Sequence, residues 1–297
     1  SPNRMRGTLS NAWGNINTPI ITDQNGDGRS DIGIFLAGQI TIFRLFLSNG
    51  NGTFSEAGGL GGYVSGVSLM VAGDFNGDLR GDLYALWRNS GYNRLFLSNG
   101  NGSYQVVELP MAQGDVAFPT SVLVAKFNAG DQQSDLFFHW TNNGVNRLFL
   151  TNWGGTSFTQ HVNPLSPASV TNLTPIHGDF NANGWDDLIF YGGSGQNKLF
   201  FNNGDGNWYE LSNPPFGTTP IGGTNKVAVA DYNGDYKADV YFYWSSTGQN
   251  RIFLGKQDST FSGFMDPICD LAAISGATFM VPGDYSGDGK GDVFFMK

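Results

Sequence analysis

The stretch Asp74-Phe-Asn-Gly-Asp-Leu-Arg-Gly-Asp82 decides the fold, together with the segment Asn93-Arg-Leu-Phe-Leu-Ser-Asn-Gly100 that follows it. Both recur along the chain of 297 residues. Copies of the acidic stretch begin at Asp23, Asp74, Lys126, Asp179, Asp231 and Asp284, in steps of 51, 52, 53, 52 and 53 residues. A nearly constant period of this size indicates one structural unit per step.

Each period contains four short apolar runs. In the second period they are Ser68 to Gly73, Leu83 to Trp87, the Arg-Leu-Phe-Leu run and a Ser-Tyr run. Asn-Gly dipeptides lie between the last two, as tight hairpins require. Four antiparallel strands in roughly 50 residues are typical of a β-propeller blade. The sequence therefore predicts an all-β protein, a six-bladed β-propeller of four-stranded antiparallel blades in a single domain over residues 1–297.

The two ends of the chain complement each other. After the sixth acidic loop, Asp284 to Asp292, only Val293-Phe-Phe-Met-Lys297 remains. Asn3-Arg4 through about Asn15 matches the third and fourth strand positions of a blade. We expect these N-terminal outer strands to complete the C-terminal blade and close the ring, because closure removes open sheet edges. An open array of repeats is the alternative.

Composition excludes several classes of protein. Charged residues make up 14% of the chain, Gly numbers 43, and aromatic residues also make up 14%, which fits a folded β-rich protein. The net charge of −9 argues against a nucleic-acid partner. No apolar run reaches the roughly 18 residues of a membrane helix, and no signal-peptide core is present. The single Cys269 excludes an internal disulfide and is expected to be a buried thiol.

The acidic loops have the ligand pattern of a calcium site. Side-chain oxygens stand at positions one, three, five and nine of the loop, and position seven offers a backbone carbonyl, which suits a cation that takes 6 to 8 oxygens. We expect about five structural Ca²⁺ ions. The predicted ligands are Asp23, Asn25, Asp27, Arg29, Asp31, Asp74, Asn76, Asp78, Arg80, Asp82, Asp179, Asn181, Asn183, Trp185, Asp187, Asp231, Asn233, Asp235, Lys237, Asp239, Asp284, Ser286, Asp288, Lys290 and Asp292.

The six loops are not equal. Lys126 replaces the first ligand of the third loop, where its ammonium group can take the place of the ion. Asn183 in loop four and Ser286 in loop six replace stronger ligands, so these loops should bind more weakly than loops one, two and five. The alternative is that the Asp and Asn side chains only shape Asx turns between strands.

A second motif, aromatic-x3-Gly-x-Asn-cation, recurs in four consecutive periods at the far end of the second strand. An aromatic face beside an amide and a cation suits a sugar, which stacks on the ring and hydrogen-bonds through its hydroxyls. Packing between neighbouring blades is the alternative role. The predicted sugar-binding residues are Trp87, Asn93, Arg94, Trp140, Asn146, Arg147, Tyr191, Asn197, Lys198, Trp244, Asn250 and Arg251.

Signs of an enzyme are few. His139, His161 and His177 form no repeated set, and no second carboxylate completes a glycosidase pair. A polysaccharide lyase with His139 or His177 as base, assisted by Tyr191 or Arg147, remains one alternative. An adhesion propeller with one protein partner is the other.

The D-F-N-G-D-x-x-x-D-L loop followed by N-R-L-F-L-S-N-G-N-G resembles the FG-GAP/VCBS repeat group, which includes adhesion modules, lectins and some lyases. Within it, the chain looks most like the fungal lectins of the Psathyrella velutina type, seven-bladed calcium-containing propellers that bind N-acetylglucosamine-type glycans between blades. The resemblance implies a secreted, calcium-stabilised, multivalent lectin whose partners are glycans or glycoconjugates. It leaves the oligomeric state open, with a homo-oligomer among the options.

Overall fold

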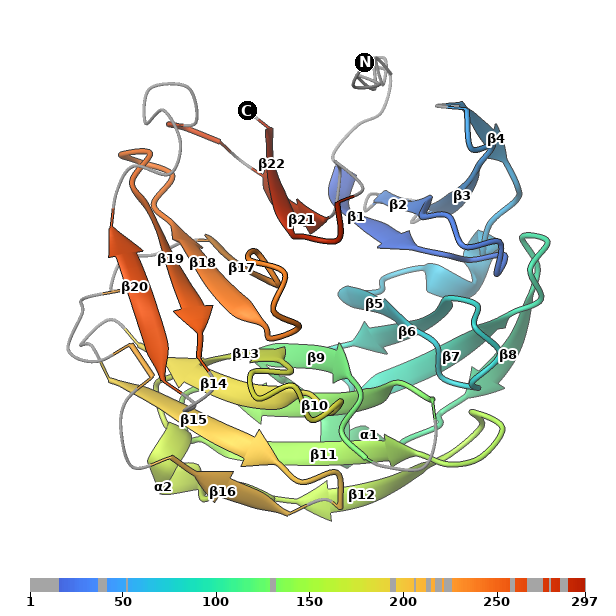
Figure 1. Ribbon diagram of the computed structural model, residues 1–297. Helices are drawn as coiled ribbons and strands as arrows, with labels where there is room; N and C mark the ends of the chain where they lie inside the picture. The colour runs from blue at the N-terminus through green and yellow to red at the C-terminus, as the bar shows by residue number, and fades with distance from the viewer. Residues whose placement is uncertain are drawn as a thin grey trace. The chain divides into compact units, whose positions relative to one another are not determined.

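The computed structural model shows an all-β protein of consecutive antiparallel sheets (Figure 1). It describes residues 16–36, 42–51, 53–128, 132–192, 196–205, 207–211, 215–216, 221, 226–256, 260–265, 275–277, 279–283 and 288–296.

Five sheets have four strands each, in the order in which the strands follow along the chain. Blade one contains β1 (Ile16–Thr22), β2 (Asp31–Leu36), β3 (Ile42–Ser48) and β4 (Phe54–Glu56). Blade two contains β5 (Leu69–Gly73), β6 (Asp82–Trp87), β7 (Tyr92–Ser98) and β8 (Tyr104–Glu108). Blade three contains β9 (Ser121–Ala125), β10 (Asp135–Trp140), β11 (Val145–Thr151) and β12 (Phe158–Val162). Blade four contains β13 (Thr174–Gly178), β14 (Asp187–Tyr191), β15 (Asn197–Asn202) and β16 (Trp208–Glu210). Blade five contains β17 (Lys226–Ala230), β18 (Asp239–Tyr243), β19 (Asn250–Gly255) and β20 (Phe261–Met265).

The prediction of six four-stranded blades was wrong. The described residues form a β-propeller with five such blades, and those of the sixth repeat form a two-stranded sheet from β21 (Phe279–Gly283) and β22 (Asp292–Met296). The period in the sequence counts acidic loops, and an acidic loop needs only the two strands that flank it. Residues 3–15, which were expected to complete the sixth blade, lie outside the described residues, as does Cys269.

The chain divides into two compact units. The first comprises Ser1–Lys126, Gly130–Phe138 and Arg147–Val162, and the second comprises Phe127–Ala129, His139–Asn146 and Asn163–Lys297. Within the first unit, β1 adjoins β5 and β5 adjoins β9; within the second, β13 adjoins β17 and β17 adjoins β21. The first strand of each blade is therefore its inner strand within a unit, and the fourth strand lies outermost.

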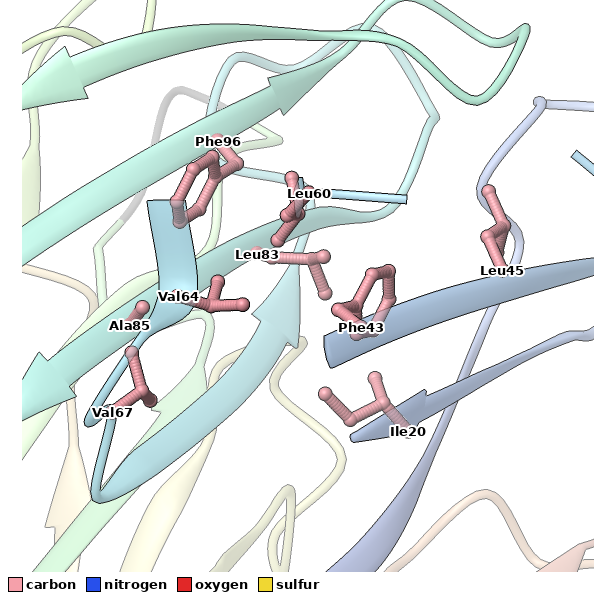
Figure 2. Packing of buried hydrophobic residues seen from close by; sticks show 9 residues of the cluster. All are labelled: Ile20, Phe43, Leu45, Leu60, Val64, Val67, Leu83, Ala85 and Phe96. Atoms are coloured by element: carbon pink, nitrogen blue, oxygen red, sulfur yellow. The ribbon is translucent and has the colours of Figure 1, made fainter. Parts of the chain in front are cut away.

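One core cluster of the first unit lies between blades one and two, where two sheet faces and the linker that joins them meet (Figure 2). Its buried members are Ile20, Phe43, Leu45, Leu60, Val64, Val67, Leu83, Ala85 and Phe96. A corresponding cluster around Phe216 and Phe242 fills the space between blades four and five. Since the apolar faces are used in these cores, the turns at the strand ends carry the polar groups.

Among the linkers that the structure describes, three contain a short helical turn between the fourth strand of one blade and the first strand of the next. They are η1 (Gly61–Val64), α1 (Gln113–Val116) and α2 (Pro167–Val170), and each ends on a fully buried valine. The buried valine anchors the turn and leaves its third residue, Tyr63, Asp115 or Ser169, outside the core. In the part of the chain that the structure describes, no helix has the length and apolar character of a membrane span.

Candidate functional site

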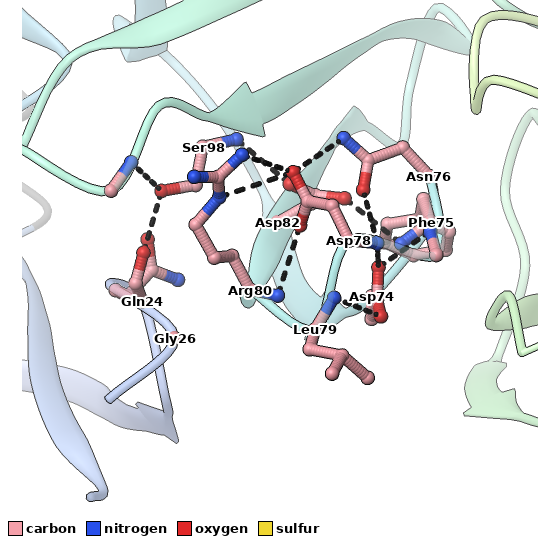
Figure 3. Close-up of polar contacts among 12 residues, drawn as sticks. Gln24, Gly26, Asp74, Phe75, Asn76, Asp78, Leu79, Arg80, Asp82 and Ser98 are labelled. Carbon is pink, nitrogen blue, oxygen red and sulfur yellow. Dashed lines mark hydrogen bonds and ion pairs between the residues drawn. The ribbon is translucent and has the colours of Figure 1, made fainter. Parts of the chain in front are cut away.

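The second acidic loop, between β5 and β6, wraps its backbone around its own polar side chains (Figure 3). Asp74 Oδ1 accepts a hydrogen bond from the Gly77 amide at 2.7 Å, and its Oδ2 accepts one from the Leu79 amide at 2.8 Å. Asn76 Oδ1 accepts from the Asp78 amide at 3.1 Å. Loops one and five form the same bonds through Asp23, Asn25, Asp231 and Asn233. The loops are therefore series of Asx turns, in which Oδ2 of the first aspartate accepts one backbone bond and keeps lone-pair capacity for a cation, whereas its Oδ1 already accepts at least two.

The ninth residue of the loop is a buried aspartate that ties the loop to the third strand. Asp82 Oδ2 accepts from the Phe75 amide at 2.9 Å, and its Oδ1 accepts from the Ser98 amide at 2.7 Å. Burial raises the pKa of the fully buried Asp82 to about 7, in spite of these two bonds. The equivalent residues Asp31, Asp187 and Asp239 make the matching pairs of bonds. This aspartate, predicted as a calcium ligand, thus has a structural role that needs no metal.

Backbone bonds join each acidic loop to the next one within a unit. The Asp23 carbonyl accepts from the Gly81 amide at 2.6 Å, and the Asp74 carbonyl accepts from the Ser134 amide at 2.6 Å. In the second unit the Asp179 carbonyl accepts from Ala238 at 2.8 Å. The approach is close: a Cβ atom on Gly81 would lie 2.1 Å from Thr22 Oγ1. The loops therefore connect neighbouring blades as well as neighbouring strands.

The seventh loop residue contributes a cation that the sequence analysis did not anticipate, because only its carbonyl was considered. The Arg80 guanidinium lies 2.6 Å from Asp78 Oδ2, Arg29 pairs with Asp27, and Lys237 Nζ lies 3.9 Å from Asp235. In loop four the seventh residue is Trp185, whose amide donates to Asn183 Oδ1. In loops one, two and five the charge of the aspartate at position five is thus partly neutralised by a cation from the same loop.

The described residues give calcium a suitable donor set without a preformed cluster. The side chains at positions one, three and five are all oxygen donors, which is the chemistry that a hard cation prefers. Among the described residues, however, no group of three His, Cys, Asp or Glu side chains comes together as a metal cluster. Lys126 Nζ lies 3.0 Å from Gln132 Oε1 in the third loop. Asp284 and Ser286 lie outside the described residues.

The recurring asparagines of the second motif are buried and hydrogen-bond to the backbone of their hairpin and of the linker that follows. Asn93 is fully buried; its Nδ2 donates to the carbonyls of Gly91 and Met111, both at 2.9 Å, and its Oδ1 accepts from the Met111 amide at 3.1 Å. Asn146 repeats this pattern with Gly144 and Leu165. Asn197 Oδ1 accepts from the Phe216 amide, and Asn250 Nδ2 donates to the Gly248 carbonyl. Because backbone groups occupy these amides, they are not presented to a ligand.

Strand register separates Tyr191 from the tryptophans with which the sequence pattern aligned it. Tyr191 is paired with Asn197, just as Tyr243 is paired with Asn250. In blade two the residue opposite Asn93 is Leu86, and Trp87 comes one position later. Neighbouring strand residues point to opposite sheet faces, and Tyr191 accordingly packs edge-on against Phe242 with ring centroids 5.4 Å apart. The one-residue shift arises because the hairpin of blade four is one residue shorter: Tyr191 precedes its partner Asn197 by six residues, whereas Tyr243 and Leu86 precede Asn250 and Asn93 by seven.

Blade two gathers three aromatic rings around one cation. The Arg94 guanidinium carbon lies 5.4 Å from the ring centroid of Trp87, 5.2 Å from that of Tyr92 and 5.5 Å from that of Tyr63. Arg94 Nε donates to Glu108 Oε2 at 2.7 Å, and its NH1 donates to the Tyr63 carbonyl. The hydrogen bond from Arg94 to the Glu108 carboxylate is the main reason why the pKa of Glu108 lies below its ordinary value. The guanidinium and the carboxylate therefore form a charge-balanced pair.

A shallow, open depression of about 260 Å³ lies over this cluster and is lined by Gly62, Tyr63 and Arg94. Its volume is close to the lower end of the roughly 300–1,000 Å³ of small-molecule sites. The side chain of Tyr63 is 54% exposed, while Trp87 is half-buried and fixed by a 2.7 Å bond from its Nε1 to the Ser65 carbonyl. Trp87 and Arg94 therefore hold η1 in place, and η1 presents the Tyr63 ring.

The other cations of the motif are engaged differently. Arg147 NH1 donates to Asp115 Oδ1 of α1 at 2.7 Å. Lys198 Nζ donates to Ser169 Oγ of α2 at 2.7 Å and to Glu210 Oε1 at 2.6 Å. In blade five, Arg251 lies over the ring of half-buried Trp244 at 5.5 Å. Trp140 is also half-buried, and its carbonyl accepts from the Gly144 amide. The four copies thus share a scaffold and differ in the residue that covers the cation.

The partners of these cations were not predicted from the sequence. The chain contains three glutamates, Glu56, Glu108 and Glu210, and each stands at the end of a fourth strand, paired with the third-strand cation of its blade. This regular placement of a rare residue was a signal that could have been found. Tyr63 gave no such signal, because its equivalents are Asp115 and Ser169.

His139 is poorly placed for catalysis. His139 is fully buried on β10 with its ring edge-on to Phe190 at 5.1 Å, and burial lowers its pKa to about 4. His177 Nδ1 lies 3.3 Å from Asp186 Oδ1. The buried, neutral imidazole of His139 is therefore a packing residue in the described structure.

Comparison with known proteins supports the architecture. A model of the FG-GAP-like repeat matches residues 179–242, which extend from the acidic loop of blade four into β18. A search of curated protein sequences found no match. A lectin from Agrocybe aegerita, described as recognising non-reducing terminal N-acetylglucosamine, superposes with a TM-score of 0.73 at 17% identity, over 95% of this chain and 75% of the lectin chain.

Two further solved structures share the fold at lower similarity. The Photorhabdus luminescens Tc holotoxin pore gives a TM-score of 0.58 at 15% identity, over 99% of this chain and 14% of that one. A periplasmic gluconolactonase of Pseudomonas aeruginosa gives 0.52 at 12% identity, over 93% and 72%. At these identities the likeness establishes the fold, and function has to be argued from the site.

Proposed function

We propose that this protein is a carbohydrate-binding β-propeller and that its saccharide site is the blade-two pocket over Arg94. The observation that carries the proposal is that the exposed Tyr63 ring and Arg94 line one surface depression, with Glu108 paired to Arg94. A sugar ring stacks its C–H face on an aromatic ring and directs its hydroxyls to donors and acceptors. Tyr63 offers the face, and Arg94 offers N–H donors.

The charge balance of the site favours a neutral sugar. Glu108 offsets the guanidinium charge at 2.7 Å, so a ligand carboxylate would meet a carboxylate as well as a cation. The likeness to the Agrocybe aegerita lectin makes N-acetylglucosamine the first ligand to test. Its acetamido carbonyl and hydroxyls are uncharged acceptors for the remaining Arg94 donors.

A glycan array followed by titration of the hit tests the proposal. We expect binding to a coherent set of neutral glycans and a loss of at least about tenfold in affinity for Tyr63→Ala, equivalent to roughly 1.4 kcal/mol. Trp153→Ala is the matched control, because Trp153 is 93% exposed and lies in the turn after β11, away from the pocket residues in the chain. A blank array with folded protein would contradict the proposal.

We also propose that acidic loops one, two and five bind Ca²⁺ as structural ions, through the side chains at positions one, three and five and the carbonyl at position seven. The oxygen-only donor set and the turn geometry of these loops support this assignment. When bound, the ion would supply charge neutralisation for the loop carboxylates. Loops of this ligand type suit an extracellular, calcium-rich setting, which is the localisation that we propose.

A further inference from the structure

Blade three repeats the Trp, Asn and Arg positions of the blade-two site, with Asp115 of the linker in place of Tyr63 and with Val145 and Val162 in place of Tyr92 and Glu108. The third residue of η1 is Tyr63, which leaves a depression over Arg94. The third residue of α1 is Asp115, and its Oδ1 accepts from Arg147 NH1 at 2.7 Å. The same nitrogen approaches the carbonyl of Gly114 at 3.4 Å. An internal carboxylate thus faces the blade-three cation from the helical turn that in blade two carries the Tyr63 ring.

The fourth strand explains why this carboxylate comes from the linker. In blade two, Arg94 lies opposite Glu108 in the strand register. In blade three, Arg147 lies opposite Val162, whose side chain is 60% exposed and offers no charge. Asp115 therefore supplies the counter-charge that a glutamate supplies in blade two.

We infer that Asp115 is a built-in occupant of the blade-three copy of the saccharide site, so that this copy is closed to ligand while the blade-two copy is open. The inference rests on the proposed function, since it takes the blade-two pocket as the site for a neutral saccharide. It makes the third residue of the linker turn the determinant of which motif copies bind. The number of open sites is then smaller than the number of motifs in the sequence.

The test uses the full chain with the blade-two site weakened by Tyr63→Ala. Asp115→Tyr in that background removes the carboxylate and supplies the ring that blade two has. Asp115→Asn is the matched control, because its amide oxygen still accepts from Arg147 and keeps the position filled. Both Asp115 and Arg147 are partly exposed, with side chains 34% and 21% accessible, so the pair is screened and its loss is compatible with folding.

Titration with N-acetylglucosamine gives the first readout. We expect Tyr63→Ala to bind at least tenfold more weakly than the original protein, Tyr63→Ala/Asp115→Tyr to recover affinity to within about threefold of it, and Tyr63→Ala/Asp115→Asn to recover nothing. If the original protein binds N-acetylglucosamine and the folded Tyr63→Ala/Asp115→Tyr variant recovers no affinity, the inference is overturned.

Reactivity of Arg147 toward phenylglyoxal, measured by mass spectrometry, gives a second readout that needs no sugar. Asp115→Ala should increase modification of Arg147 at least fivefold and leave Arg94 unchanged. An unchanged rate at Arg147 would show that Asp115 does not cover it and would overturn the inference. Absence of any sugar binding by the original chain would instead overturn the proposed function, and the Arg147 rates would still decide whether Asp115 covers the cation.

Discussion

Asn93 and Asn146 fill the same place in blades two and three, where a buried amide ties a hairpin to the linker that follows it. Replacing Asn146 by alanine leaves backbone groups of Leu165 and Gly144 unpaired in a buried position. We expect a loss of about 2 kcal/mol in the free energy of unfolding, measured by urea titration. The control Asn143→Ala removes one bond at an exposed position of the same hairpin and should cost less. Equal losses of stability in Asn146→Ala and Asn143→Ala would argue against a special role for the buried Asn146 hydrogen bonds.

His139 gives a prediction for pH at the same scale. Burial lowers its folded-state pKa to about 4 from an ordinary 6.5, so the folded protein binds the proton less well than the unfolded chain. The stability that the neutral ring contributes is complete above pH 6.5 and is lost as the pH falls toward 4, with about 2 kcal/mol lost by pH 5. His139→Phe should remove this loss. Urea unfolding at pH 7 and pH 5 measures this. The free energy of unfolding of His139→Phe, relative to that of the original protein, should be higher at pH 5 than at pH 7. The same relative value at both pH values would contradict the assignment.

At the scale of elements, the hairpins of the second motif pack directly on the helical turns of the linkers. A Cβ atom on Gly91, which has a φ of +70°, would lie 2.0 Å from the Gln113 carbonyl oxygen of α1. A Cβ atom on Gly144 would likewise lie 2.0 Å from the Pro167 carbonyl oxygen of α2. Glycine is thus required here by both backbone conformation and space.

Gly91→Ala should therefore destabilise the protein by about 2 kcal/mol or more, as judged by thermal unfolding. Gly114→Ala is its control, because Gly114 lies within α1 and a Cβ atom there meets nothing within 4 Å. We expect that control to leave the melting temperature unchanged or slightly raised. A tolerant Gly91→Ala variant would mean that the hairpin does not rest on α1.

Recurrence explains which of these elements the sequence could reveal. The acidic loops, the four strands per blade and the Gly and Asn positions recur because every blade needs them, so the period exposed them. The blade-two pocket depends on Tyr63, which its equivalents Asp115 and Ser169 do not resemble, and repetition could not reveal it. Repetition also led to the prediction that Asn93 binds sugar. A polar residue that recurs in every blade can be required by the fold or by a binding site, and the period does not distinguish the two.

At the scale of the whole molecule, the sixth acidic loop led to a count of six blades, whereas the described residues form five four-stranded blades. The chain also carries a net charge of −9, to which the loop aspartates contribute most of the acidic groups. If the loops bind Ca²⁺, each ion stabilises the folded state by about 2.7 kcal/mol at a hundredfold excess over its dissociation constant.

We therefore expect the melting temperature to fall when calcium is removed by a chelator and to recover when calcium, but not magnesium, is restored. Differential scanning calorimetry in matched buffers measures this. A melting temperature that is the same with calcium and with chelator would show that the Asx turns and the Arg29 and Arg80 ion pairs hold the loops without metal.

The central claim is that the Tyr63 pocket of blade two binds a neutral saccharide, and isothermal titration of the full chain with N-acetylglucosamine tests it most directly. The account predicts saturable binding that Tyr63→Ala weakens at least about tenfold and Trp153→Ala leaves unchanged. Binding that is indifferent to Tyr63→Ala would place the site elsewhere on the molecule and contradict the account.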